Sequence, residues 1–166
     1  LISASTTGDN NVINVYNNAN KIFNLKKGWP IGAVSWGLGN IGNASVSTLM
    51  KDLRQRFDDG SNKNRNSEWF LDRQTYSVRQ VAELVRKFFF EECFTSAFKD
   101  IEPKQSLGFI VAGYSANGTM AEEYQINIIN GECLTPVQIR KDDEAGATWN
   151  GQIDAISRLM LGFSNR

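Results

Sequence analysis

The chain has 166 residues and a mass of 18.6 kDa, with 41% hydrophobic and 22% charged residues, which predicts one globular domain with a sizeable core and excludes a disordered or collagen-like chain. Eighteen basic residues balance eighteen acidic ones, which argues against nucleic acid or an anionic membrane as a partner. Because the sequence has no histidine, it cannot by itself form Ser-His-Asp or Cys-His catalytic sites or imidazole metal sites.

The first forty residues predict hairpin-rich β structure. Asparagines alternate with apolar residues over 9–20, which is typical of a short, irregular strand between turns. Residues 21–25 (KIFNL) and 31–36 (IGAVSW) predict two strands, and Gly28 and Pro30 predict the turn between them.

Two long helices are predicted next. The apolar residues between 46 and 57 follow a helical period, and Asp58 to Gly60 predict the helix end and the start of a polar loop over 58–68. Ser77 and Gln80 have the spacing of a capping box, which predicts a second helix over 77–98. Its four phenylalanines at 88–94 are too many for one narrow stripe, so we expect the helix to be covered on two sides, and a neighbouring subunit is one candidate for the second cover.

Strands return in the last third of the chain. The apolar run 107–114 predicts a buried strand, the Asn-Gly turn within 115–118 a tight hairpin, and 121–129 its partner. A short strand over 132–139 and a helix over 151–163 follow. Because strands and helices are clustered rather than alternating, the order predicts an α+β fold with antiparallel strands.

The longest apolar runs are well short of the ~20 residues that cross a bilayer, and no secretion signal is visible. We therefore expect a soluble, cytoplasmic protein with no membrane partner. Cys93 and Cys133 are too few ligands for a zinc site and are interpreted as reduced core thiols, so no metal is expected.

A glycine motif, GLGNIG, contains Gly37, Gly39 and Gly42 and matches the G-x-G-x-x-G pattern of dinucleotide-binding turns. No βαβ unit precedes residue 107, which disfavours that function, and no cofactor is expected. Small residues that allow a tight turn and close packing explain the motif more simply. Nucleotide binding stays as a distant hypothesis.

The order of several segments resembles the proteasome-type β-subunits of the N-terminal-nucleophile hydrolases. LISASTTG, NKIFNL and SWGLGNIG correspond to the first half of that family domain, and LGFIVAGYSANGTMAEEYQINIINGE and GATWNGQIDAISRLM to later parts. The resemblance implies a four-layer αββα sandwich, with two antiparallel sheets between outer helices. It also implies that residues 1–166 form a single domain that is incomplete at both ends, and that the protein assembles as a homo-oligomeric ring or stack.

The resemblance also assigns site residues. Lys21 matches the family's active-site lysine, although a lysine at a strand start is by itself a solvated edge residue. Gly37 matches the glycine whose N–H stabilises the oxyanion, and Thr7 lies near the threonine whose main chain pairs with a peptide substrate. Asn150 falls where the family has a serine, and Ser5 where it has an acidic residue.

Two functions remain open on this basis. In the first, the protein hydrolyses peptide or small amide bonds through an N-terminal nucleophile that lies upstream of Leu1, since the hydroxyls at 5–7 are too near Lys21 for the family's spacing and belong to a strand or turn. In the second, the chain is a non-catalytic ring-assembly protein of the same fold, because Ser5 and Asn150 depart from the family pattern.

Overall fold

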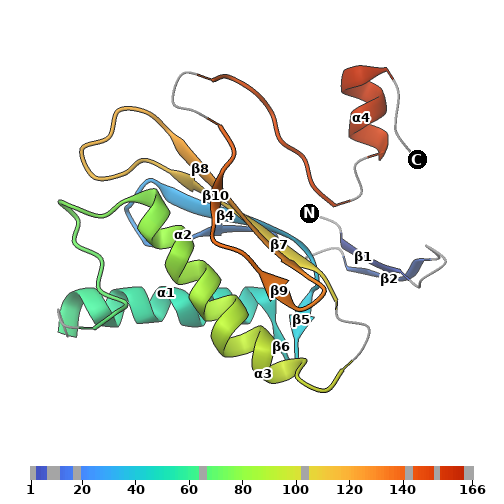
Figure 1. The fold of residues 1–166 in the computed structure, drawn as a ribbon, viewed down its shortest axis with the longest axis horizontal. Coiled ribbons are helices and arrows are strands. Elements are labelled where there is room, and N and C mark those ends of the chain that lie inside the picture. Colours follow the sequence, from blue (N-terminus) through green and yellow to red (C-terminus); the bar gives the residue numbers. More distant parts are fainter. Residues whose placement is uncertain are drawn as a thin grey trace.

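A six-stranded sheet forms the centre of the computed structural model (Figure 1), which describes residues 3–6, 12–16, 20–63, 67–101, 105–140, 144–151 and 154–162. Its strand order is β10-β8-β7-β4-β3, and β9 pairs with the end of β8. The bounds are β3 Ile22–Asn24, β4 Ile31–Gly37, β7 Leu107–Gly113, β8 Glu122–Ile129, β9 Glu132–Cys133 and β10 Val137–Gln138. Every pairing in it is antiparallel, so the predicted α+β class is confirmed.

Two small antiparallel ladders accompany this main sheet. β1 (Ser3–Thr6) pairs with β2 (Val12–Tyr16), with a register shift between Ser5 and Thr6. β5 (Asn40–Ile41) pairs with β6 (Ala44–Ser45) directly after the main strand β4. The described part of the first forty residues is therefore hairpin-rich, as predicted.

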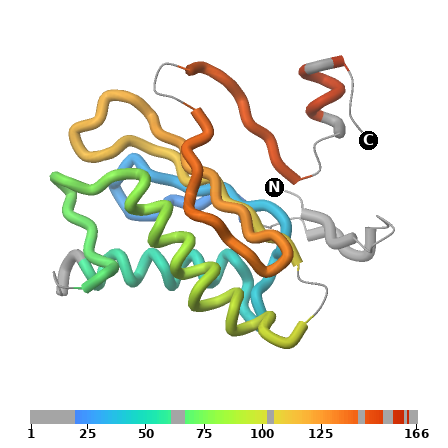
Figure 2. The backbone as a smooth tube through the Cα atoms, in the orientation of Figure 1, coloured from blue at the N-terminus to red at the C-terminus, as the bar shows by residue number. Residues whose placement is uncertain are grey.

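Helices cover one face of the main sheet (Figure 1). They are α1 (Val46–Lys63), α2 (Val78–Arg86), the π-helix η1 (Lys87–Phe94) and α3 (Thr95–Ala97). A further helix, α4 (Asp154–Leu161), follows an extended segment over 144–151 (Figure 2).

The core lies between this face and the helices. Successive cross-strand neighbours on β4, β7 and β8 point into it, because alternate residues of a strand share a face. Ser35 lies opposite Phe109, which lies opposite Ile126, and all three are buried. The Phe109 ring centroid is 4.5 Å from that of Phe89 in η1, so the π-helix packs directly on the middle of the sheet.

The opposite face of the main sheet, which we call the outer face, carries exposed apolar side chains. Ile22 and its cross-strand partner Val34 are 66% and 37% exposed, and Val137 is 60% exposed. Trp36 also lies on this face, with its indole against Gly108: a Cβ at that glycine would come within 2.2 Å of two ring carbons. The absence of a side chain at Gly108 therefore leaves the space that the Trp36 indole occupies.

The first long helix is longer than predicted. α1 continues to Lys63, so the prediction that Asp58 to Gly60 end the helix is wrong. Gly60 is buried, and a Cβ there would lie 2.8 Å from the carbonyl carbon and oxygen of Trp69. This glycine lets another stretch of backbone approach the helix instead of ending it.

The second helix occupies nearly the predicted span and begins as predicted, with the Ser77 side chain accepting a hydrogen bond from the Gln80 N–H at 3.0 Å. Its middle, η1, is a π-helix rather than an α-helix, which the apolar spacing did not indicate. Phe88, Phe89 and Phe94 are buried by this chain itself, while half-buried Phe90 lies under the Arg86 guanidinium. The two-sided cover thus comes largely from the same chain.

The last third differs from the prediction in its details. β7 and β8 form a hairpin, but the connecting loop is longer than a tight turn, with Asn117 in the left-handed region. The strand predicted over 132–139 is divided into β9 and β10, separated by 134–136, where Pro136 has no N–H to donate to a ladder. The described part of the final helix, Asp154–Leu161, lies within the predicted span 151–163.

Candidate functional site

The two predicted catalytic residues lie on the same face of neighbouring strands. The Ser35 N–H donates to the Lys21 carbonyl at 2.9 Å, which extends the β3–β4 register by one residue and places Lys21 opposite Ser35. Gly37 is two residues further along β4, so it is a diagonal neighbour of Lys21, and such pairs have Cα atoms about 7–8 Å apart. Ser35 lies on the helix-covered face, and both residues share that face with it.

The backbone N–H of Gly37 points toward the neighbouring strand β3, which Lys21 directly precedes. The next residue, Leu38, donates its N–H to the Ser106 carbonyl on the β7 side at 3.1 Å. Because successive N–H groups of a strand point to opposite sides, the Gly37 N–H points toward the β3 side. Gly37 has φ +85° and a Cβ there would lie 2.4 Å from the Ser106 oxygen, so this end of β4 requires glycine.

Lys21 is half-buried, and burial lowers the pKa of its ammonium below the ordinary lysine value. Within the described part of the chain, the structure gives it no carboxylate partner that would oppose this effect. A lysine in this state releases its proton more readily than a solvated one. The neutral amine is therefore easier to reach at Lys21 than at a solvated lysine.

The other two predicted site residues have different outcomes. Thr7 lies outside the described residues. Asn150 is half-buried in the extended segment 144–151, and the next residue, Gly151, lies against Trp36: a Cβ on Gly151 would be 3.7 Å from the Trp36 Cβ. Since Trp36 precedes Gly37, the chain returns to the same end of β4, but on the outer face rather than on the face of Lys21.

Arg140 holds the extended segment near the sheet. Its guanidinium donates to the Glu123 carboxylate on β8 and, at 2.9 Å, to the Thr148 hydroxyl. Trp149 in turn donates from its indole N–H to the Ser157 hydroxyl of α4 at 3.2 Å. These contacts link β8, the segment that carries Asn150, and α4.

The glycine motif does not form a dinucleotide-binding turn. Gly39 and Gly42 flank β5 of the β5–β6 hairpin, and α1 begins only at Val46, whose N–H bonds to the Gly39 carbonyl at 2.9 Å. The strand before the motif belongs to an antiparallel sheet, whereas the dinucleotide turn requires a βαβ unit. Gly42, with φ +56°, therefore serves the turn of a tight local hairpin, and Gly39 precedes that hairpin.

Neither cysteine is activated. Cys93 is half-buried and Cys133 buried, both as free thiols, in agreement with the sequence interpretation. Burial raises the pKa of each thiol, which leaves less of the nucleophilic thiolate near neutral pH. Among the described residues no group of three or more Cys, Asp and Glu side chains is placed to hold a metal ion.

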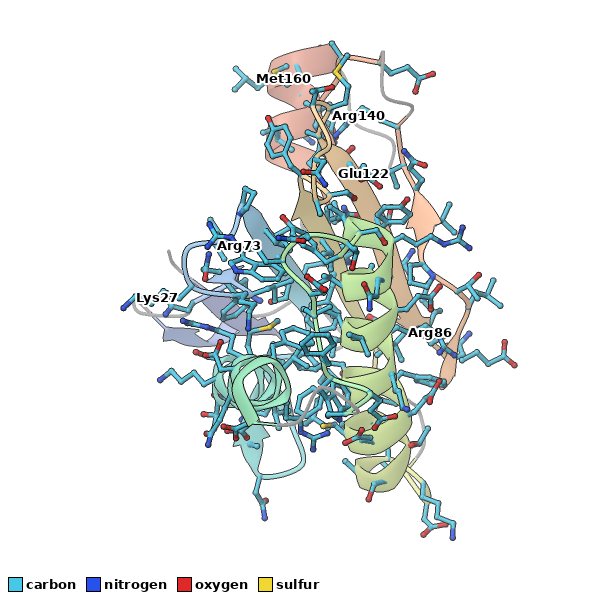
Figure 3. All side chains as sticks on the ribbon, turned by 90° about the vertical axis from the view of Figure 1, so that its left-hand side faces the viewer. Lys27, Arg73, Arg86, Glu122, Arg140 and Met160 are labelled. Carbon is cyan, nitrogen blue, oxygen red and sulfur yellow. The ribbon has the colours of Figure 1, made fainter. Side chains whose placement is uncertain are left out.

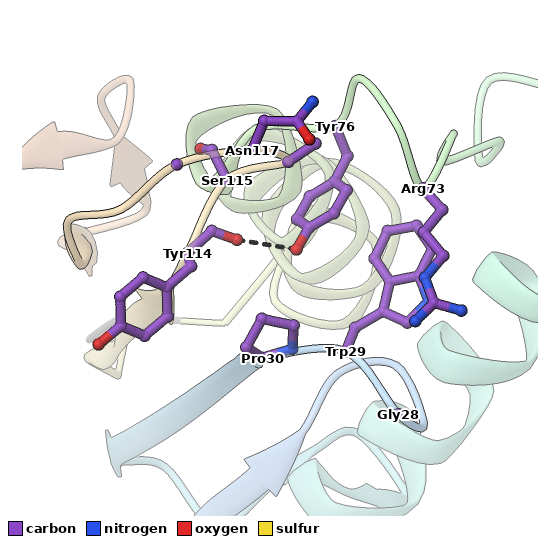
Figure 4. A pocket seen from close by; sticks show the side chains of 10 residues that line it. Gly28, Trp29, Pro30, Arg73, Tyr76, Tyr114, Ser115 and Asn117 are labelled. Carbon is purple, nitrogen blue, oxygen red and sulfur yellow. Dashed lines mark hydrogen bonds between the residues drawn. The ribbon is translucent and has the colours of Figure 1, made fainter.

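A cavity of about 360 Å³ lies at the opposite end of β4, and sequence reasoning missed it (Figure 4). It is bordered by the turn before β4, by the residues before α2 and by the loop after β7. The larger aromatic and polar side chains that line it are Trp29, Arg73, Tyr76, Tyr114 and Asn117. They are far apart in sequence and no local pattern connects them, so only the fold brings them together.

In the part of the chain that the structure describes, no helix combines the length and the apolar character that a membrane span needs. A scan against models of known protein families found no match, and a search of curated proteins found no relative.

Proposed function

We propose that this chain is a proteasome-like subunit of an N-terminal-nucleophile hydrolase that cleaves peptide or small amide bonds. The observation that carries the proposal is that Lys21 and Gly37 are diagonal neighbours on one face of the sheet, with the Gly37 N–H directed toward the β3 side. The nucleophile itself, a threonine, serine or cysteine at a freed N-terminus, would lie on residues that precede Leu1.

The chemistry divides between these groups. The nucleophile's oxygen or sulfur adds to the substrate carbonyl carbon while its proton passes to the free α-amine, and the Gly37 N–H donates to the oxyanion that forms. Collapse of the intermediate breaks the C–N bond as the proton passes to the leaving amine, and water then hydrolyses the acyl-enzyme. In this proposal Lys21, whose pKa is lowered by burial, helps keep the nucleophile and the amine in their reactive protonation states.

The outer face of the main sheet supports the proposed four-layer architecture. Ile22, Val34 and Val137 are apolar and exposed there, and an antiparallel sheet that faces only water is normally polar on that side. In this proposal a second sheet packs on the outer face, and the protein assembles with further copies of itself as a ring or stack.

The alternative is a non-catalytic assembly protein of the same fold. Two observations favour it: Lys21 has no carboxylate partner in the described part of the chain, and Gly151, the residue after Asn150, lies against Trp36 on the outer face. Under this alternative the Lys21 edge of the sheet is a remnant of an active site.

The test uses the product of the whole gene. Mass spectrometry identifies the mature N-terminus, and a panel of fluorogenic peptide amides measures turnover for the parent protein, Lys21→Ala and the matched control Lys27→Ala, whose lysine is exposed and outside the site. We expect Lys21→Ala to lose activity by at least about 100-fold, as for loss of a group that sets a nucleophile's protonation, with an unchanged melting temperature and with Lys27→Ala unaffected.

Two results would contradict the enzyme. One is a mature N-terminus without threonine, serine or cysteine, and the other is turnover that Lys21→Ala leaves intact. Analytical ultracentrifugation measures the oligomeric state and so tests the alternative function. A ring or stack without turnover supports the assembly protein, and a monomer without turnover contradicts both functions.

A further inference from the structure

The cavity at the start of β4 is separate from the Lys21 edge. β4 runs from Ile31, beside the cavity, to Gly37, and six residue steps of about 3.3 Å place the two ends about 20 Å apart. What binds in the cavity therefore does not depend on the proposed hydrolase chemistry.

Three of the ten residues that line the cavity are aromatic, and hydrogen bonds hold two of these three, Tyr76 and Tyr114, in place. The rings of Trp29 and Tyr76 lie 4.3 Å apart between centroids at an interplanar angle of 35°. The Tyr76 hydroxyl donates to the Tyr114 carbonyl at 2.8 Å (Figure 4), and the Ala116 N–H donates to the Tyr76 carbonyl at 2.9 Å. The Tyr114 N–H donates to the Pro30 carbonyl at 3.1 Å, so hydrogen bonds join the three segments around the cavity.

Arg73 supplies a positive charge at this cavity. Its side chain is exposed and lies close enough to Tyr76 for its charge to lower the pKa of that phenol, against the larger raising effect of burial. In the described part of the chain, no carboxylate forms an ion pair with Arg73. Lys27, in the turn that also holds Trp29, adds a second exposed positive charge on the same side of the molecule (Figure 3).

Two carboxylates in the segments around the cavity accept hydrogen bonds from groups other than Arg73. One oxygen of Asp72 accepts the Gln74 N–H at 2.8 Å. Glu122, the first residue of β8, accepts from the Ser115 hydroxyl and, at 3.1 Å, from the Tyr124 hydroxyl. The guanidinium of Arg73 thus remains available at the cavity, whose aromatic walls suit a planar ring.

We propose that this cavity binds a small aromatic carboxylate, with its ring against the aromatic side chains and its carboxylate on Arg73. A guanidinium binds a carboxylate through two parallel N–H donors, and an aromatic wall adds stacking energy. A cationic ligand, which an aromatic cage alone would also suit, is disfavoured by the charge of Arg73. The volume, about 360 Å³, holds one or two fused rings and lies at the lower end of the range for ligand sites.

The test compares indole-3-acetate with the neutral indole-3-acetamide, which has the same ring. Binding to the 166-residue chain is measured by ¹⁵N–¹H NMR titration, for the parent, Arg73→Gln and the control Arg79→Gln, an exposed arginine of α2 outside the cavity. We expect shifts at the Trp29 indole and at residues 114–118. The parent should bind the amide about tenfold or more weakly than the acid, as for loss of one charge-assisted pair. Arg73→Gln should bind the acid more weakly than the parent by a similar factor, while Arg79→Gln should bind it as the parent does.

Three results would overturn the proposal: no binding of the acid at millimolar concentration, equal binding of acid and amide, or unchanged binding in Arg73→Gln. A second variant, Trp29→Leu, tests the wall and should weaken acid and amide alike. Because its ring also packs on Tyr76, circular dichroism melting first establishes that Trp29→Leu is folded. If folded Trp29→Leu binds both ligands as the parent does, the ring is not in this cavity and the proposal fails.

Discussion

Lys26 links the turn between β3 and β4 to α1 through hydrogen bonds. Although it is a lysine, it is only 7% exposed, and its ammonium donates to the Phe57 carbonyl at 3.0 Å and to the Asp58 carboxylate at 3.1 Å. It also lies 5.3 Å from the centroid of the Trp29 ring. Asp58 is half-exposed, so solvent screens the ion pair, and the buried bond to the carbonyl matters more.

We therefore expect Lys26→Met to lower the free energy of unfolding by about 1.5–3 kcal/mol, the range for a hydrogen bond to a charged group. The neighbouring Lys27 is exposed, and Lys27→Met should change stability by no more than about 0.5 kcal/mol. Urea unfolding followed by circular dichroism measures both variants. Equal stability of the two would show that the Lys26 contacts contribute nothing.

The thiols give a pH-dependent prediction. Burial raises the pKa of Cys93 and of Cys133, so the folded chain holds both protons to higher pH than the unfolded chain does. The stability that this contributes is present below the ordinary thiol pKa and is lost as pH rises through the raised values. At pH 8 we expect the native thiols to react with a disulfide reagent at least about tenfold more slowly than the unfolded chain, and to react faster as pH rises. Equal rates at pH 8 would contradict the shielding.

At the level of strands, the contact between Trp36 and Gly108 links β4 to β7 on the outer face. A methyl group at Gly108 would come within 2.2 Å of the indole, so Gly108→Ala must displace the ring. We expect a loss of about 1–3 kcal/mol, typical of overpacking, and a red shift of tryptophan emission as the indole becomes wetter. Gly39→Ala is the control, since Gly39 has open space around its Cβ position and an ordinary φ. An unchanged spectrum in Gly108→Ala would exclude this packing.

The elements that the sequence predicted well are those in which a local pattern of residues decides the structure. The apolar run of β7 and the Ser77 cap of the second helix are examples. The failures lie where tertiary contacts outweigh local preference: Gly60, a poor helix former, stays within α1 and admits the Trp69 backbone, and η1, whose Phe89 packs on Phe109 of the sheet, is a π-helix.

The candidate sites divide in the same way. Lys21 and Gly37 were predicted as site residues because a family resemblance supplied the order of motifs, and the strand register places the two residues on one face. The cavity was not found, because Trp29, Arg73 and Tyr114 come from three separate segments that meet only in the fold. Residue identity alone therefore indicates neither their proximity nor the available charge of the arginine.

At the scale of the whole molecule, the outer face decides whether the main sheet is one layer of a larger sandwich. Ile22 is 66% exposed in this chain, so Ile22→Glu should change the stability of the 166-residue chain by no more than about 0.5 kcal/mol. In the product of the whole gene, a second sheet would bury this position, and an unpaired carboxylate there should cost about 3 kcal/mol or more. Thermal and urea unfolding of both lengths measures the difference, with the exposed Lys27→Glu as a control. A loss that is the same small value in both lengths would mean that no second sheet packs on this face, and the four-layer proposal would fail while the shared face of Lys21 and Gly37 would stand.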